Sequence, residues 1–519
     1  MSDYTYLTRF YKSKLMLKQI ACFIEKVIQY LFLIINFESY LKIFTQSNLP
    51  TFIHCLSCDQ ISRLSKMNWQ TLFSNKRLGA ELRNAQEHFR TDYMRDYDRL
   101  IFSSQFRRLQ NKTQVFPLPG AVFVHNRLTH SLEVASVGRS LGKAIGEKIV
   151  EKHHEELNQE AIEFYKFELS AVIMTACIAH DIGNPPFGHS GEEAIRTYFK
   201  ELDGEKLAFL TENLTENQFN DFKYFEGNAN AFRILTTIFN QSNLNLTYTT
   251  LASIIKYPAD STNGFKKKSF ISAKKSGFFD AEIGFFKRIA TELNINALNE
   301  EKTIFARHPF VFLVEAADDI CYRIIDLEDA HRLNIISIQE ARNLLEPFFE
   351  NRAGKPTITE KVDNIEDDKQ KLAFLRAMLI NQLVSKCTDV FFQYESQLLD
   401  GTLNKPLIDL LDEKTTSLIA KIDEISVKKI YNDKSVIEIE IAGYHVIGGL
   451  LKEFISAVLQ PNSSKSKKLL QLIPSQYPIK KDENVYQNIQ SVVDFISGMT
   501  DLFAIDLYRK ITGIQIPHL

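Results

Sequence analysis

A stretch of ten residues without charge, 170–179, ends in an adjacent histidine and aspartate, His180 and Asp181. Such an apolar run is typical of a buried helix. The Pro-Pro pair at 185–186 must end that helix, because proline fixes φ and has no N–H to donate. The chain therefore places an imidazole and a carboxylate together at the end of a buried helix. Burying both is costly unless something pairs them, and the two groups can bind one metal ion.

The next helix is expected to begin directly after this break. Ser190, followed three residues later by Glu193, has the pattern of a capping box at a helix N-terminus. That start places His189 and Glu192 at the helix entrance, where free backbone N–H groups and the helix dipole attract anions. One short segment thus combines two candidate metal ligands, an anion-attracting helix start and a candidate acid/base pair.

A second group of polar residues lies further along the chain. Asp318, Tyr322 and Asp326 follow one another at four-residue steps, which aligns them on one helix face. A metal ligand at Asp318, an aromatic ring at Tyr322 and a hydrogen-bonding carboxylate at Asp326 would suit a sugar that lies along the helix. A solvated acidic face has the same pattern, and the spacing favours neither interpretation. His130 is a further candidate ligand, although a lone histidine in an apolar helix is more often a core residue.

The spacing of apolar residues predicts a mostly α fold. Apolar side chains recur at three- and four-residue steps from Phe310 to Leu327, and residues 132–150 and 161–179 have the same pattern. The clearest candidate strand is 435–441 (SVIEIEI), where apolar and charged residues alternate. With 20 Gly and 14 Pro in 519 residues, a loop-rich β architecture is disfavoured.

We divide the chain into three parts. Residues 1–66 form an N-terminal extension of unknown role, residues 67–345 carry the candidate chemistry, and residues 346–519 form a C-terminal helical region. The hydrophobic content of 45% and the charged content of 24% are typical of a soluble globular protein.

Cysteine usage and hydropathy indicate a cytoplasmic protein. The cysteines are scattered, as reduced core thiols are, and the first residues lack the features of a secretory signal. Cys55 and Cys58 have a metal-like spacing, but no second Cys or His pair completes a zinc site. The apolar run at 30–37 is too short to span a bilayer, so we expect no membrane association.

Together these motifs resemble the deoxyguanosine triphosphate triphosphohydrolase (dGTPase) family, within the HD-domain metal-dependent phosphohydrolase superfamily. The similarity runs from Met67 to about Asp329, with a weaker echo at 497–504 (SGMTDLFA). It is carried by residues 99–115 (RLIFSSQFRRLQNKTQV), 126–133 (NRLTHSLE), 179–192 (AHDIGNPPFGHSGE), 225–229 (FEGNA) and 315–320 (EAADDI). The resemblance implies an HD-type helical phosphohydrolase fold with an additional C-terminal helical region.

The resemblance also assigns roles to particular residues. The implied metal ligands are His130, His180, Asp181 and Asp318. Asp318 is preferred to its neighbour Asp319 because only Asp318 keeps the four-residue step to Tyr322. The implied acid/base pair is His189 and Glu192. The implied substrate contacts are Gln114 and Asp326 at the sugar 3′-hydroxyl, Tyr322 against the 2′ position, and Arg127 and Lys256 on the phosphates. One departure is Asn230, where relatives often carry Gln.

The reaction implied is hydrolysis of a deoxynucleoside triphosphate, with dGTP as the family substrate, to a deoxynucleoside and inorganic triphosphate. A divalent ion, Mn²⁺ or Mg²⁺, is the implied cofactor. Members of the family assemble into multimers, so a homo-oligomer is expected.

Two other functions fit parts of the sequence. An HD-type phosphodiesterase acting on another nucleotide would need the His180-Asp181 pair but not the row from Asp318 to Asp326. A nucleic-acid-binding regulator would use the lysines at 266–268, 274 and 275, which could bind single-stranded phosphate backbones. A solvated surface loop explains these lysines more simply, and the net charge of −2 gives no general case for nucleic-acid binding.

Overall fold

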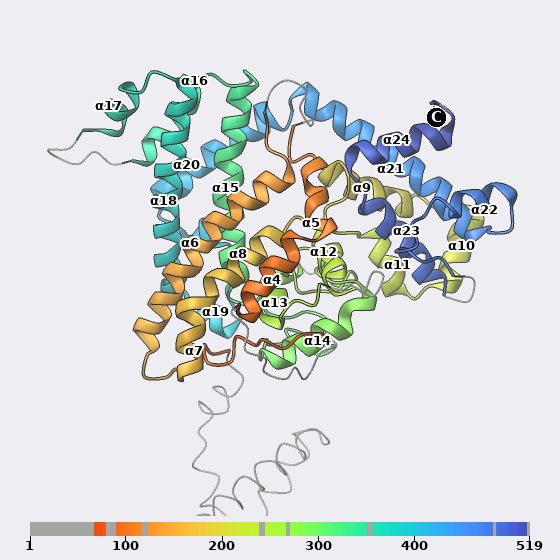
Figure 1. Ribbon diagram of the computed structural model, residues 1–519, viewed down its shortest axis with the longest axis horizontal. Coiled ribbons are helices and arrows are strands. Elements are labelled where there is room, and N and C mark those ends of the chain that lie inside the picture. Colours follow the sequence, from red (N-terminus) through yellow and green to blue (C-terminus); the bar gives the residue numbers. More distant parts are fainter. Residues whose placement is uncertain are drawn as a thin grey trace, which may run out of the picture. The chain divides into compact units, whose positions relative to one another are not determined.

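The structure is a computed structural model of the chain, and it describes residues 67–78, 90–116, 123–237, 244–265, 270–349, 356–480 and 484–515. All of these lie in one compact unit, Lys66–Leu519. Cys55, Cys58 and the run at 30–37 fall outside the described residues. The predicted mostly α fold is confirmed, because extended segments within the described ranges meet only at isolated bridges such as that of Arg77 with Thr247 (Figure 1).

The first hydrophobic core surrounds three long helices that pack on one another, α6 (Arg127–His153), α8 (Leu169–Ala179) and α15 (Val311–Arg332) (Figure 1). The other helices of this core are α4 (Asp92–Ile101), α5 (Ser104–Arg108), α7 (Gln159–Glu163), α13 (Tyr248–Ile254), α14 (Ile283–Glu292), α16 (Ile338–Leu345), α17 (Ile358–Asp363), α18 (Asp368–Gln393), α19 (Glu395–Asp400) and α20 (Glu413–Ile425).

A second core is formed by helices from two distant parts of the sequence. It joins α9 (Gly188–Lys200), α10 (Gly204–Asn213) and α11 (Glu216–Lys223) to the C-terminal helices α21 (Lys434–Leu459), α22 (Ser464–Leu470), α23 (Val485–Ser497) and α24 (Asp501–Thr512). In Figure 1 these yellow-green and blue helices lie together on the right. The remaining helix, α12 (Gly227–Thr236), contributes Ala229 to the second core and Phe232 to the first.

Short helical turns complete the secondary structure. Single 3₁₀ turns lie at Leu109–Asn111, Ile271–Ala273, Asp280–Glu282, Glu346–Phe348 and Leu407–Leu410. Two π-helical turns lie at Phe164–Glu168 and Ser426–Ile430. The predicted helix at 161–179 is therefore three segments, in which the first π turn separates α7 from α8. The helices predicted at 132–150 and across 310–327 are present as α6 and α15.

The strand predicted at 435–441 is wrong, because these residues form the first turns of α21. The alternation of the segment is compatible with either structure, but Asp433 caps a helix here by accepting the backbone N–H of Ser435 at 2.9 Å. Further along, Leu450, Leu451 and Phe454 are buried in the second core. Burial of the helix downstream outweighs the local preference of a β-branched run.

Helix α21 is also the one described helix that is long and apolar enough to cross a membrane by length and composition. Its buried leucines pack against α9, α22 and α23, as those of a core helix do.

The part at 346–519 packs into both cores rather than forming a separate body. Leu372, Leu379 and Phe391 of α18 belong to the same cluster as Leu313 and Leu327 of α15. The division at residue 345 between a catalytic domain and a C-terminal region therefore stays a prediction.

Helix α6 approaches the segment 165–170, at the start of α8, very closely through glycines. A Cβ atom on Gly146 would lie 2.0 Å from the carbonyl oxygen of Tyr165, and one on Gly142 would lie 2.9 Å from the Cα of Ser170. Because these neighbours are backbone atoms, they cannot move aside as the end of a side chain can. Glycine is therefore required for the distance between α6 and α8.

Replacing Gly146 by alanine is expected to destabilise the fold by about 1–3 kcal/mol, since the two helices must separate. Gly448 in α21 is the matched control, because a Cβ there meets nothing within 4 Å. Gly448→Ala should stabilise the protein by up to about 1 kcal/mol through helix propensity. Urea unfolding measures both, and equal stability of the two variants would contradict the packing argument.

Candidate functional site

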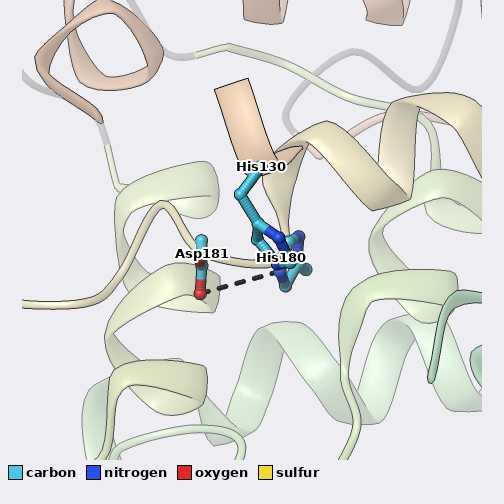
Figure 2. A group of neighbouring side chains, drawn as sticks. All are labelled: His130, His180 and Asp181. Carbon is cyan, nitrogen blue, oxygen red and sulfur yellow. Dashed lines mark ion pairs between the residues drawn. The ribbon is translucent and has the colours of Figure 1, made fainter. Parts of the chain in front are cut away.

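Four side chains from three helices of the first core converge on one point. His130 lies in the first turn of α6, His180 and Asp181 follow the last residue of α8, and Asp318 lies in the middle of α15. Ligand atoms of His130, His180 and Asp181 lie within 4.8 Å of one another (Figure 2). The Nε2 atoms of His130 and His180 lie 3.1 and 3.6 Å from Asp318 Oδ1. The structure thus brings together the four ligands predicted from the sequence.

Neighbouring groups orient two of these side chains. His180 Nδ1 donates to the carbonyl oxygen of Cys177 at 2.6 Å, which turns Nε2 toward the cluster. Arg127 Nη1 lies 2.8 Å from Asp181 Oδ2, and Asn184 Nδ2 donates to Asp181 Oδ1. A histidine held by a carbonyl and a carboxylate held by donors are typical surroundings of metal ligands.

The charges in the cluster offset one another. Burial opposes ionisation of Asp318, but His180 and His130 hold its pKa well below its usual value. Burial likewise opposes ionisation of Asp181, and Arg127 with the two histidines lowers the pKa of that carboxyl. Two anionic carboxylates and two imidazoles form a mixed N and O donor set of the kind that binds divalent ions such as Mn²⁺, Fe²⁺ or Co²⁺. The residues present therefore fit a metal ion.

A cavity of about 560 Å³ opens beside this cluster. Its volume is in the range of small-molecule binding sites. Among the predicted site residues it is lined by Gln114, Arg127, His130, His180, Asp181, His189, Lys256, Asp318, Tyr322 and Asp326. Glu192 lies behind His189 and does not line the cavity.

His189 and Glu192 form a hydrogen-bonded pair, with His189 Nδ1 3.0 Å from Glu192 Oε2. The side chain of His189 is 80% exposed, whereas that of Glu192 is only 2% exposed. Glu192 is fixed by the backbone N–H of Gly227, which donates to Oε1 at 2.7 Å. Burial opposes its ionisation, but His189, Lys275 and Arg196 lower its pKa to about 2. A permanent anion thus orients an accessible imidazole.

The predicted capping box at Ser190 and Glu193 is wrong, because the N-cap of α9 lies three residues earlier, at Phe187, and the helix begins at Gly188. Phe187 takes the N-cap position in a left-handed conformation (φ 62°) without a side-chain cap. Gly188 is also left-handed (φ 57°), and a Cβ on it would lie 2.6 Å from Arg127 Nη2. A close approach of the turn to Arg127 therefore sets the helix start, a constraint that local sequence does not carry.

The predicted substrate residues differ in their partners. Gln114 Oε1 is buried and has no hydrogen-bond partner among the described residues. Lys256 Nζ lies 3.4 Å from Glu315 Oε1, and although burial opposes its charge, Glu315 raises its pKa above the usual value. Asp326 accepts a hydrogen bond from the hydroxyl of Tyr431 at 2.7 Å, and burial raises the pKa of this carboxyl to about 7. Tyr431 belongs to the C-terminal region, where no sequence motif pointed to it.

Lys275 is the main functional candidate that sequence reasoning missed. It was grouped with neighbouring lysines in a basic loop, of which 266–268 lie outside the described residues. The structure instead places Lys275 at the cavity, with Nζ 2.9 Å from Glu226 Oε1. Its adjacent Ser-Gly-Phe-Phe run was the available signal, because apolar residues there anchor the lysine in the fold.

Asn230 does not line the cavity. Its Nδ2 donates to the carbonyl oxygen of Gly183 at 2.7 Å, in the turn that follows the metal ligands. Asn230, which stands where Gln was expected from the resemblance, thus contacts this turn and not the cavity.

Comparison with known proteins agrees with this geometry. Residues 127–240 match the HD domain, and residues 410–510 match the phosphohydrolase-associated domain. A deoxyguanosinetriphosphate triphosphohydrolase-like protein of Synechocystis is 37% identical over 462 residues, covering 87% of this chain and 100% of the relative. A like-named protein of Pseudomonas aeruginosa is 36% identical with the same coverage. The chain belongs to the deoxyguanosinetriphosphate triphosphohydrolase family.

Members of the family also include a protein of Yersinia enterocolitica named deoxyguanosinetriphosphate triphosphohydrolase. It is 30% identical over 488 residues, which cover 81% of this chain and 93% of the relative. Like these relatives, the chain is an HD-domain hydrolase. The HD match spans α6 and α8, which carry three of the four predicted ligands, and the second match spans C-terminal helices.

Asp318→Ala is expected to weaken Mn²⁺ binding by at least about a hundredfold, because it removes a ligand from a closed set of four. Asp319→Ala is the matched control. The Asp319 carboxylate lies 3.5 Å from Arg323 rather than against the histidines, so this variant should bind Mn²⁺ within about threefold of the wild type. Isothermal titration of the metal-free proteins measures both. If only Asp319→Ala lost Mn²⁺ binding, the fourth ligand would be Asp319 rather than Asp318.

Proposed function

We propose that this protein hydrolyses deoxynucleoside triphosphates, dGTP foremost, to the deoxynucleoside and inorganic triphosphate. The observation that carries the proposal is the convergence of a two-histidine, two-aspartate cluster with an exposed histidine and several cations around one cavity. The names of the relatives support the same reaction.

The metal would be held by His130, His180, Asp181 and Asp318. A bound divalent ion, Mn²⁺ or Mg²⁺, supplies positive charge at the α-phosphate and lowers the pKa of a water molecule that attacks the phosphorus. Arg127 keeps Asp181 anionic, and the Nδ1–H of His180 fixes its tautomer, so both side chains are preset for binding.

The leaving group needs a proton, because a nucleoside alkoxide leaves poorly. His189 is placed to supply it, since Nδ1 is engaged by Glu192 and Nε2 remains available on an exposed ring. As the water oxygen bonds to the α-phosphorus, the bond to the 5′-oxygen breaks and that oxygen takes the His189 proton. The attacking water releases its own proton to solvent. Glu192 stabilises the imidazolium before the transfer.

The triphosphate would contact the cations of the cavity. Arg127 and Lys256 are candidates from the sequence, and Lys275 joins them from the structure. Each already has one carboxylate partner, which holds it in place while other protons remain free to donate. Arg127 Nε has no hydrogen-bond partner among the described residues.

The sugar would lie along α15. Gln114 offers an unpaired buried oxygen and Asp326 a carboxyl held by Tyr431, and both suit a 3′-hydroxyl. The ring of Tyr322 would crowd the 2′ position and favour deoxyribose over ribose. This arrangement favours a deoxynucleotide over the cyclic or other nucleotides of HD-type phosphodiesterases.

Other expectations from the sequence stay predictions. They are self-association, single-stranded nucleic-acid binding, a cytoplasmic location and the absence of membrane association.

Product analysis tests the reaction directly. Incubation of the full chain with each dNTP and NTP, with Mn²⁺ or Mg²⁺, should give deoxynucleoside and inorganic triphosphate from dGTP and little product from ribonucleotides. Release of monophosphate and pyrophosphate, or of free phosphate, would exclude the proposed reaction.

His189→Ala should lower kcat for dGTP by about a hundredfold or more, because it removes the proton donor to the leaving group. Mn²⁺ affinity should be unchanged, since His189 is not among the ligands. His445→Ala, on the exposed side of α21, is the control and should keep full activity. A His189→Ala protein with near-normal turnover would remove this histidine from the mechanism.

A further inference from the structure

The turn at 181–187 connects the two cores of the molecule. It begins with Asp181, a member of the candidate metal cluster, and ends with Phe187, which is buried in the second core. His189 follows two residues later, so its position relative to the metal cluster depends on how this turn is held.

Asp501 is the side chain that holds the end of the turn. Its Oδ1 accepts the backbone N–H of Phe187 at 3.0 Å, and its Oδ2 accepts the backbone N–H of Thr113 at 2.8 Å. Both hydrogen bonds are buried, and Asp501 itself is 4% exposed. One carboxylate therefore joins the residue before Gln114 to a residue two positions before His189.

Lys112 ties the middle of the same turn to the segment that precedes Asp501. Its buried Nζ donates to the carbonyl oxygen of Ser497 at 2.9 Å and to that of Asn184. Through Lys112, which precedes Thr113, the end of α23 is thus linked to the turn at 181–187.

Asn230 adds a third contact to the turn. Its Nδ2 donates to the carbonyl oxygen of Gly183, and lies 3.3 Å from Ser497 Oγ. The segment 497–501 belongs to the weaker similarity at 497–504, which had no assigned role in the sequence.

We propose that Asp501 is a positioning residue, which fixes the Gln114 segment and the turn before His189 to each other through its two buried hydrogen bonds. The expected change in kcat rests on the proposed function, but the expected change in the turn can be measured without any substrate. Under it, the C-terminal region matched to the phosphohydrolase-associated domain helps to build the active site.

The backbone at Phe187 explains why such a tether is needed. A left-handed conformation in a residue other than glycine is strained and persists only where the surroundings hold it. The carboxylate of Asp501 supplies that support with a charge-assisted hydrogen bond. Without it, the turn is expected to relax and carry His189 away from the leaving oxygen.

Asp501→Asn is the test variant. An amide has one oxygen, so its NH₂ group must face one of the two backbone N–H donors. In the full chain we expect kcat for dGTP to fall about a hundredfold, as a shift of about 1 Å in a reacting group can cause, with KM changed less than about fivefold. Mn²⁺ affinity should stay within about threefold, because His130 and Asp318 lie in packed helices and His180 is the C-cap of α8.

Hydrogen exchange gives the readout that does not depend on activity. Amides of 184–190 should exchange at least about tenfold faster in Asp501→Asn than in the wild type, because Phe187 loses its acceptor. If Asp501→Asn does not fold, Asp501→Ser takes its place, since a serine leaves room for a water molecule.

Asp494→Asn is the matched control. Asp494 is a buried carboxylate on α23 that pairs with Arg233 at 2.8 Å and makes no contact with the turn. It should lower the unfolding midpoint at least as much as Asp501→Asn, yet keep kcat within about threefold and leave exchange of 184–190 unchanged.

The outcomes separate the two proposals. If the wild type does not hydrolyse any dNTP, the proposed function fails, while the exchange comparison still tests the tether. If the wild type is active and Asp501→Asn keeps its kcat, or exchanges at the wild-type rate at 184–190, the positioning role is refuted. Equal loss of kcat in Asp494→Asn would also refute it, because the effect would then follow from stability alone.

Discussion

Two imidazoles and two carboxylates meet inside the first core, and the rest of the site is arranged around the charge that they bring there. An isolated buried carboxylate would be too costly to keep. Here the histidines offset Asp318, and Arg127 offsets Asp181 at 2.8 Å. The cluster exists only if α6, α8 and α15 meet at a fixed distance. Gly146 allows that distance, because its missing side chain lets α6 lie against the carbonyl of Tyr165.

The second constraint is the turn at 181–187, through which the chain runs from the first core to the second. The four predicted metal ligands lie in or directly after helices of the first core, whereas His189 is carried by α9 of the second. Between them the chain makes a tight turn that ends in the left-handed Phe187. Reaction at a phosphorus atom needs the ion, the water and the acid within a few tenths of an ångström of their working positions. Under the proposed function, the contacts from 497–501 to this turn would therefore matter for catalysis as the predicted ligands do.

The C-terminal region beyond residue 345 also contributes contacts to the site. Tyr431 holds Asp326, and Asp501 holds the backbone at Phe187, so the C-terminal half completes a site whose ligands come from the first half. Local sequence reasoning failed in related places. The alternation at 435–441 predicted a strand, and Ser190 predicted a capping box, but in each case burial and close packing against distant segments determined the helix start.

The sequence by itself determined the fold class, the long helices and the residues of the candidate metal cluster, because these depend on apolar periodicity and on adjacent residue types such as His180-Asp181. Only the tertiary structure decided that Lys275 lines the cavity, that Tyr431 donates a hydrogen bond to Asp326, and that Asp501 accepts the backbone N–H of Phe187 before His189. These features join residues up to several hundred positions apart. Periodicity records which face of a helix is buried, but not which distant segment covers it.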